Sequence, residues 1–147
     1  LGRPLTAPVD GVKDARCVQE TCGDLVAFIR SLPFVYETEH YIFVHAGLDL
    51  TLPDWHETTD YQKVWIRQPF HEATNQTGKT IVFGHTPVHY LLDQKIGTKE
   101  LWMTEDGKIG MDGGAVYGGV LHGILFDESG MRADVALVND GFAAIDD

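Results

Sequence analysis

The sequence predicts a mixed α/β fold, and three patterns support this class. One segment carries apolar residues at helical spacing, two short segments are apolar at nearly every position, and the last third alternates between apolar runs and turn signals. A strand without polar residues is typical of a parallel sheet that is covered on both faces. We therefore expect a helix, then buried strands, then a strand-rich C-terminal part.

The predicted helix covers residues 21–32. Thr21 and Asp24 have the spacing of a capping box, and the apolar residues from Leu25 to Leu32 recur at helical intervals. Pro33 then ends the helix. Residues 1–16 mix proline, glycine and charge without periodicity, so we expect a loop or tail there.

The expected strands begin with a hairpin. Residues 34–37 and 41–44 are β-branched and aromatic, and the residues between them are polar. A short helix is expected around Tyr61–Ile66, ended by Pro69. Further strands are expected at 80–83, 101–104, 108–111, 120–126 and 132–138, with a turn at 105–107.

Composition narrows the class of protein. The chain has 147 residues, the size of one domain, and its formal net charge of −11 argues against nucleic acid or an anionic membrane as a partner. We find neither an apolar run of membrane-spanning length nor a signal peptide. Cys17 and Cys22 fit reduced thiols better than a redox or zinc motif. We expect a single cytoplasmic domain over residues 1–147.

Two histidines stand where a ligand site is expected. His45 and His85 each follow an apolar strand, and small or turn-forming residues come next. Ligands of open α/β sheets bind where the chain leaves the carboxyl ends of the strands, and a buried strand holds an imidazole rigidly. Spacing alone still favours structural histidines over metal ligands, so both interpretations stay open at this point.

The remaining histidines have simpler interpretations. His85 and His89 have the spacing of two zinc ligands on a protease helix, but Pro87 between them would disrupt that helix, and we reject this site. Three histidines lie on polar stretches, where we expect exposed, solvated side chains: His40, His56 and His71. His122 lies in an expected strand, where a histidine with satisfied hydrogen bonds is the default.

Arg67 is a cation in an apolar and aromatic stretch. Its planar fork of donors matches two oxygens of a phosphate, while a structural pair with a carboxylate is the alternative. The glycines within residues 113–119 do not indicate a nucleotide loop, because such a loop needs a helix after it. Residues 120–126 read as a strand instead, so we expect a tight turn.

Four blocks of the sequence resemble a known family when they are taken in order. They are Tyr41–Leu48, Trp65–Phe70, Ile81–Pro87 and Asp112–Gly119. Together they resemble the bacterial serine/threonine protein phosphatases of the calcineurin-like metallophosphoesterase family, over roughly residues 17–127. The order of the four blocks is specific, although each block alone is a weak signal.

The resemblance implies a fold, a metal centre and an activity. The family fold is a sandwich of two mixed sheets flanked by helices, of which this chain would form the C-terminal half. His45 and His85 would bind the second of two divalent metal ions, with manganese expected first and iron or zinc as the other candidates. Arg67 would bind phosphate. The implied activity is phosphate monoester hydrolysis, on a phosphoprotein or a small phosphate ester.

The sequence also departs from the family. Its upstream motifs, Gly-Asp-x-His-Gly, Gly-Asp-x-x-Asp-Arg-Gly and Gly-Asn-His-Glu, do not occur in these residues. We expect a C-terminal portion that carries only part of the dinuclear site, is inactive alone and self-associates through exposed apolar surface. A symmetrical dinucleoside tetraphosphate hydrolase and a non-catalytic module on the same scaffold are the alternatives.

Overall fold

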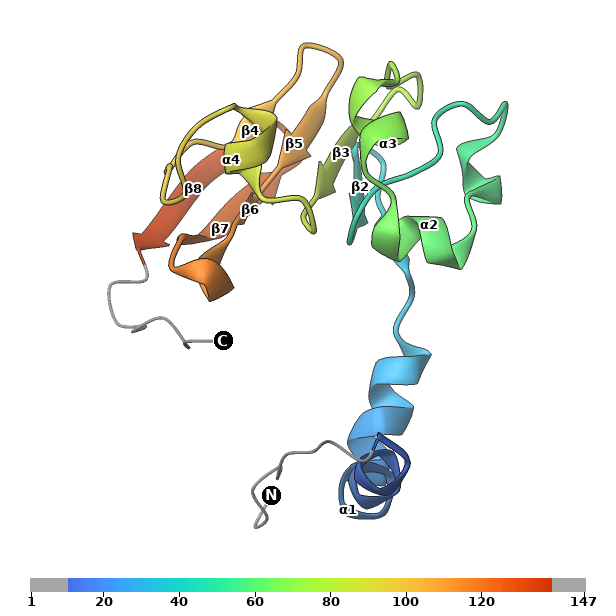
Figure 1. Ribbon diagram of the computed structural model, residues 1–147. Coiled ribbons are helices and arrows are strands. Elements are labelled where there is room, and N and C mark those ends of the chain that lie inside the picture. The colour runs from blue at the N-terminus through green and yellow to red at the C-terminus, as the bar shows by residue number, and fades with distance from the viewer. Residues whose placement is uncertain (1–10, 139–147) are drawn as a thin grey trace. The chain divides into compact units, whose positions relative to one another are not determined.

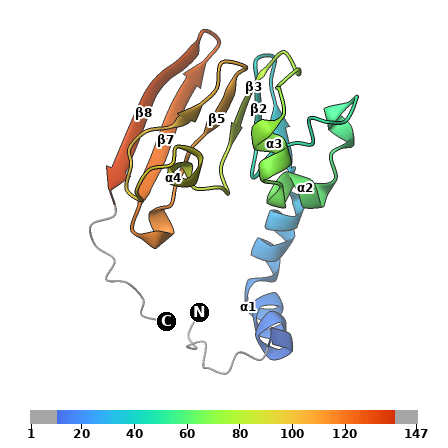
Figure 2. The ribbon, with the colours of Figure 1, turned by 45° about the horizontal axis from the view of Figure 1, so that its top comes forward.

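The structure, a computed structural model, describes residues 11–138. The chain divides into two units, the first ending at Pro33 and the second beginning at Phe34. The elements of each unit can be followed in Figures 1 and 2. A single domain over residues 1–147 stays a prediction.

The predicted mixed α/β class is confirmed, because the second unit combines two sheets with a few short helices. Its elements are β1 (Val35–Glu37), β2 (Tyr41–Val44), η1 (Trp55–Glu57), α2 (Asp60–Trp65), α3 (Gln68–Glu72), β3 (Thr80–Phe83), α4 (Val88–Leu91), β4 (Trp102–Met103), β5 (Lys108–Gly110), β6 (Asp112–Gly113), η2 (Ala115–Tyr117), β7 (Val120–Asp127) and β8 (Gly130–Val138).

The first unit contains the helix α1 (Gly11–Ser31). Its second half matches the helix predicted at 21–32. The loop predicted over residues 1–16 was wrong for residues 11–16, because α1 begins at Gly11, and residues 1–10 lie outside the described residues. Good helix formers such as Lys13 and Arg16 fill the first half without an apolar period. Cys22 interrupts the helical geometry, with φ −131° and ψ 31°. Across residues 11–138, no helix has the length and apolar composition that a membrane span requires.

Sheet A has the strand order β1-β2-β3-β5-β4. Its three inner strands are parallel, with Ile42 opposite Ile81 and Ile81 opposite Lys108. The outer strands β1 and β4 pair antiparallel with β2 and β5, which confirms the hairpin predicted at residues 34–44 and the turn predicted at 105–107. Because β2, β3 and β5 run the same way, their carboxyl ends meet at one edge of the sheet.

Sheet B consists of β6, β7 and β8, all antiparallel. The last two predicted strands are confirmed within two residues, and β7 has a register irregularity between Leu125 and Phe126. The Phe126 ring lies 4.9 Å from the Tyr41 ring and 5.8 Å from the Phe43 ring, measured between centroids. Sheet B therefore packs against one face of sheet A.

The other face of sheet A carries the main core. Phe70 of α3 meets Phe83 of β3 edge-on, with ring centroids 4.8 Å apart. Burying a phenylalanine contributes about 1.5–3 kcal/mol, so this contact holds α3 on the sheet. The buried members of the core are Ile42, Val44, Leu48, Phe70, Ile81 and Phe83.

Proline 69 has a different role from the predicted one. We expected it to end the helix around residues 61–66, but α2 already ends at Trp65 and Pro69 lies in the first turn of α3. Proline is tolerated there because the first backbone N–H groups of a helix have no intrahelical partner. Thr59 and Gln62 form a capping box at the start of α2.

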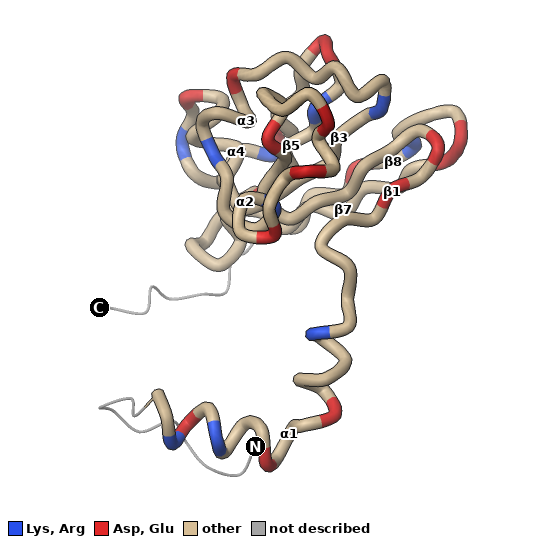
Figure 3. The backbone as a smooth tube through the Cα atoms, turned by 90° about the vertical axis from the view of Figure 1, so that its right-hand side faces the viewer, with Lys and Arg blue, Asp and Glu red and all other residues tan. Residues whose placement is uncertain are grey.

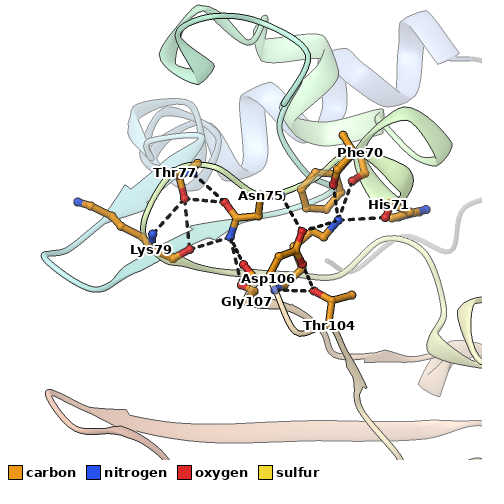
Figure 4. Close-up of polar contacts among 10 residues, drawn as sticks. Phe70, His71, Asn75, Thr77, Lys79, Thr104, Asp106 and Gly107 are labelled. Atoms are coloured by element: carbon orange, nitrogen blue, oxygen red, sulfur yellow. Dashed lines mark hydrogen bonds and ion pairs between the residues drawn. The ribbon is translucent and has the colours of Figure 1, made fainter.

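Buried Lys108 ties β5 to the end of α3, and Figure 4 labels three of the residues around its ammonium group, Phe70, His71 and Asp106. Its ammonium group donates hydrogen bonds to the carbonyl oxygens of Phe70, His71 and Ala73 at 3.4, 3.0 and 2.6 Å. The carboxylate of Asp106 lies 3.6 Å away, and the lysine side chain is only 3% exposed. A cation at a helix C-terminus satisfies carbonyls that lack intrahelical partners. Lys108 thus fixes α3 relative to sheet A.

Asp106 is held in place from the other side. The Asn75 N–H donates to its carboxylate at 2.7 Å, and the Thr104 hydroxyl donates to its second oxygen. Burial disfavours the charged form of Asp106, but the hydrogen bonds from Asn75 and Thr104 and the charge of Lys108 hold its pKa below the ordinary value. The network in Figure 4 therefore presents an ionised carboxylate to the buried ammonium group.

The outer face of sheet B is apolar and exposed. Leu121 pairs with Leu137 across β7 and β8, and both side chains are about three-fifths exposed, at 60% and 61%. Leu125 and Val135 lie on the same face and are exposed as well. Such a surface is compatible with association, and the self-association expected from the sequence stays a prediction.

Candidate functional site

The site predicted from the sequence lies at the edge where the parallel strands of sheet A end. His45 directly follows β2, and Gly84 and His85 directly follow β3. The Gly84 N–H donates to the His45 carbonyl at 2.8 Å. A Cβ built on Gly84 would lie 3.8 Å from the Cβ of Asp112, which follows β5 closely. Three chain segments therefore converge on one point.

The structure brings the two predicted histidines together. The ring centroids of His45 and His85 lie 5.1 Å apart at an angle of 58°. The His45 side chain is exposed, whereas Nε2 of His85 is buried and has no hydrogen-bond partner among the described residues. Buried polar atoms normally have a partner, so the pair offers a nitrogen that is available to a ligand.

The backbone at His85 is unusual for a non-glycine residue. Its φ of 64° lies in the left-handed region, which is uncommon for residues with a Cβ. The N–H of Thr86 donates to the Gly84 carbonyl at 2.7 Å, so the chain reverses tightly around His85. Strained conformations of this kind occur preferentially at functional sites. The turn separates β3 from α4.

Burial and positive charge lower the pKa of His85. Burial is the largest cause, followed by the nearby cation of Arg67 and by His45, while Asp112 acts in the opposite direction. His85 is therefore held neutral. A neutral imidazole has a free lone pair, as metal binding requires.

Arg67 lies one residue before α3 and is exposed. Within residues 11–138, no carboxylate pairs with its guanidinium group, so the described part of the chain does not support the structural ion pair that was the alternative. Its charge lowers the pKa values of both His85 and His71. The ring of Trp65 lies 5.1 Å from that of His85. Arg67 thus brings a positive charge to the histidine pair, and no carboxylate within residues 11–138 neutralises it.

The two histidines fit part of a metal shell. Two imidazoles that each place one nitrogen about 2.1 Å from a shared ion hold their ring centres roughly 5 Å apart, which agrees with the 5.1 Å between His45 and His85. Across residues 11–138, no group of three or more His, Cys, Asp or Glu side chains is arranged to hold a metal ion. The described residues therefore offer two imidazoles whose spacing is compatible with one metal ion, without a third side chain placed to complete a shell.

Sequence reasoning missed two residues near the pair. Asp112 was quoted in the fourth block without a role, although it lies beside Gly84 and acts on His85. His71 was expected to be solvated, and this was wrong. It is half-buried on α3, stacks on Phe83 with centroids 5.6 Å apart, and has a buried Nε2 without a partner in the described residues. The sequence would have indicated the burial of His71 only if the start of a helix at residue 68 had been predicted.

Other predictions about candidate sites are confirmed. His85 precedes α4 and His89 lies within it, so the two do not share a helix as zinc protease ligands would. The glycine cluster forms a turn, with Gly114 and Gly118 in left-handed conformation, and β7 follows it. For His122 the prediction is confirmed in part. The side chain is buried in β7 and its Nδ1 shares a hydrogen bond of 3.0 Å with Asp134, but Nε2 has no partner in residues 11–138, so the histidine is not fully satisfied.

His56 is exposed as expected, with 58% of its side chain accessible, and it also belongs to a charged cluster. Its ring nitrogens lie 2.6 Å from the carboxylate of Asp54 and 3.4 Å from that of Glu37. Lys79 pairs with the second oxygen of Glu37 at 2.7 Å. Asp54 first, and then Glu37, raise the pKa of His56 against the effect of burial, and Lys79 lowers the pKa of Glu37. The cluster links β1 to η1.

This cluster predicts a pH-dependent contribution to stability. A raised histidine pKa stabilises the fold below the unfolded value of about 6.5, and this contribution is lost as pH rises through the folded pKa. The lowered pKa of Glu37 stabilises the fold only above its unfolded value. His56→Gln should therefore lower the urea midpoint most between about pH 5 and 6.5, and little at pH 8. His40→Gln is the control, and a deficit of equal size at every pH would contradict the assignment.

No model of a known protein family matches the chain, and no curated protein matches it either. The assignment of a function therefore depends on the residues themselves and on their arrangement at the edge of sheet A.

Proposed function

We propose that this chain contributes to the active site of a metal-dependent phosphoric monoester hydrolase, a serine/threonine protein phosphatase of the calcineurin-like metallophosphoesterase family. The observation that carries the proposal is the pairing of His45 and His85, whose rings lie 5.1 Å apart after adjacent parallel strands. The charge of Arg67, which no carboxylate of residues 11–138 pairs with, supports the same assignment. The four sequence blocks resembling that family all lie in the second unit.

Four residues of the chain have separate roles in the proposed reaction. His45 and His85 would bind a divalent metal ion, manganese first, through one ring nitrogen each. When bound, such ions supply Lewis-acid polarisation of the phosphate and an activated water. Arg67 would bind two phosphate oxygens and orient the ester for attack. Trp65, beside His85, would shield one side of the site from bulk water.

The proposal expects the other ligands outside this sequence. Two histidines make an incomplete shell, so the 147-residue chain should bind metal weakly and should not turn over p-nitrophenyl phosphate with manganese. The coding sequence upstream of Leu1 should contain the two Gly-Asp motifs and the Gly-Asn-His-Glu motif. If these motifs are missing there, the non-catalytic module becomes the better account.

Arg67→Ala tests the proposed phosphate contact. In the protein translated from the complete coding sequence, the substitution should lower kcat/KM for a phosphoserine peptide by about 10²-fold, because one donor to the developing charge is lost. Arg132→Ala, which removes an exposed arginine paired with Asp127, should leave turnover unchanged. Equal losses in both variants would contradict the role of Arg67. Preferred turnover of diadenosine tetraphosphate would favour the alternative hydrolase.

A further inference from the structure

A second cavity lies at the opposite end of β2 from the histidine pair. It has a volume of about 380 Å³ and lies between the turn that joins β1 to β2 and the end of β7. Tyr41 begins β2 and lines this cavity, whereas His45 follows the last residue of the strand. Because the strand between them spans about 13 Å, the cavity is separate from the candidate metal site.

The floor of the cavity is aromatic. Tyr41, Phe43 and Phe126 line it, with ring centroids 4.9, 5.8 and 5.9 Å apart. None of these three pairs is stacked face to face, since their interplanar angles are 53°, 72° and 35°. All three side chains are only half-buried. Ring surface therefore remains available to a guest.

Two local features hold this floor in shape. The register irregularity in β7 lies directly before Phe126, and bulges of this kind re-aim a side chain. The Tyr41 hydroxyl donates to the Asp127 carbonyl oxygen at 3.1 Å, which joins β2 to the end of β7. The aromatic rings are thus positioned by the backbone of both sheets, and the cavity is part of the folded unit.

The rim of the cavity is negatively charged. Glu39, Asp127 and Glu128 line it, and none of its eight described lining residues is Lys or Arg. Figure 3 shows acidic residues gathered where the turn between β7 and β8 lies beside β1. Arg132 pairs with Asp127 and offsets its charge, so Glu39 and Glu128 leave the rim with a net negative charge.

We propose that this cavity binds a small organic ammonium ion with an apolar body, such as a quaternary ammonium ion. Aromatic ring faces attract ammonium groups through their quadrupole, and quaternary ammonium ions are recognised in this way. Glu39 and Glu128 add the complementary charge, while a phosphate or carboxylate would be repelled by the same rim. The cavity volume of about 380 Å³ lies within the range of small-molecule sites. This inference does not depend on the phosphatase proposal.

Choline and 3,3-dimethyl-1-butanol test the proposal directly, because the second compound replaces the charged nitrogen with carbon. In the 147-residue chain, choline should shift the ring proton resonances of Tyr41, Phe43 and Phe126 in an NMR titration. The neutral isostere should bind about tenfold more weakly. Equal affinity for both compounds would reduce the cavity to an apolar patch, and no shift with choline would remove the site. Either result overturns the proposal.

Two variants separate the contributions of charge and rings. The double substitution Glu39→Gln with Glu128→Gln should weaken choline binding and leave the neutral isostere unaffected. Glu57→Gln with Glu105→Gln changes the net charge equally outside the cavity and should have little effect on either. Phe126→Leu keeps an apolar floor but removes a ring face, so it should weaken choline selectively. Unchanged choline affinity in both the acidic double variant and Phe126→Leu would contradict the assignment.

Discussion

Lys108→Met is expected to destabilise the second unit by about 3 kcal/mol, because it removes a buried cation whose partners stay behind. The carbonyl oxygens of Phe70, His71 and Ala73 would lose their donor, and Asp106 would lose its counter-ion. The side chain of Lys108 is 3% exposed, so water cannot replace it without opening the structure. Methionine fills a similar volume, which isolates the loss of the charge.

Urea unfolding followed by circular dichroism measures this effect. Lys99→Met is the matched control, since Lys99 is exposed and its replacement should change stability by less than about 0.5 kcal/mol. The lower free energy of unfolding of Lys108→Met should be accompanied by shifts of the Arg67 and His71 amide resonances, because Lys108 holds α3 on sheet A. A variant as stable as the wild type would show that the carbonyls of α3 do not depend on Lys108.

Gly113→Ala should lower the free energy of unfolding by a comparable amount, about 3 kcal/mol, because the new Cβ would clash with the backbone. A Cβ at Gly113 would lie 2.1 Å from the Val120 carbonyl oxygen and 2.8 Å from its carbonyl carbon. Val120 is the residue paired with Gly113 across β6 and β7, so one strand must move away from the other. The shift would also displace Asp112, which lies beside the histidine pair.

Gly123→Ala provides the control within sheet B. Gly123 lies in β7, and a Cβ there would meet no atom within 4 Å. Replacing a strand glycine without a clash reduces the entropy of the unfolded chain, so this variant should be as stable as the wild type or slightly more stable. Similar unfolding midpoints for the two alanine variants would show that the close approach of β6 and β7 is relaxed at little cost.

The strands of the second unit could be predicted well from the sequence. Apolar runs such as 41–44 and 80–83 indicate buried strands, because the burial of a strand can be predicted from a few consecutive residues. The turn at 105–107 also carries its own glycine signal. The pairing of β2 with β3, and therefore the approach of His45 to His85, follows only from the order of strands in space. The separation of 40 positions between His45 and His85 along the chain could not predict that their rings lie close together.

The remaining features depend on contacts that distant segments make. Lys108 reads as an ordinary turn lysine until α3 places three carbonyl oxygens around it. His71 reads as solvated until α3 turns its ring onto Phe83. The first half of α1 has no buried residue and hence no apolar period to find. For Lys108 and His71 the cause is the same, because a local pattern does not contain the distant partner.

The central claim is that His45 and His85 share a metal ion, and a titration of the 147-residue chain with Mn²⁺ tests it most directly. A paramagnetic ion broadens the nearest resonances even when it binds weakly. We expect the ring protons of His45 and His85 to broaden before those of His40, His56 and His122, and His85→Ala to abolish the early broadening at His45. Broadening that begins at His56 and its carboxylates, with the histidine pair unaffected, would show that the pair does not share a metal ion.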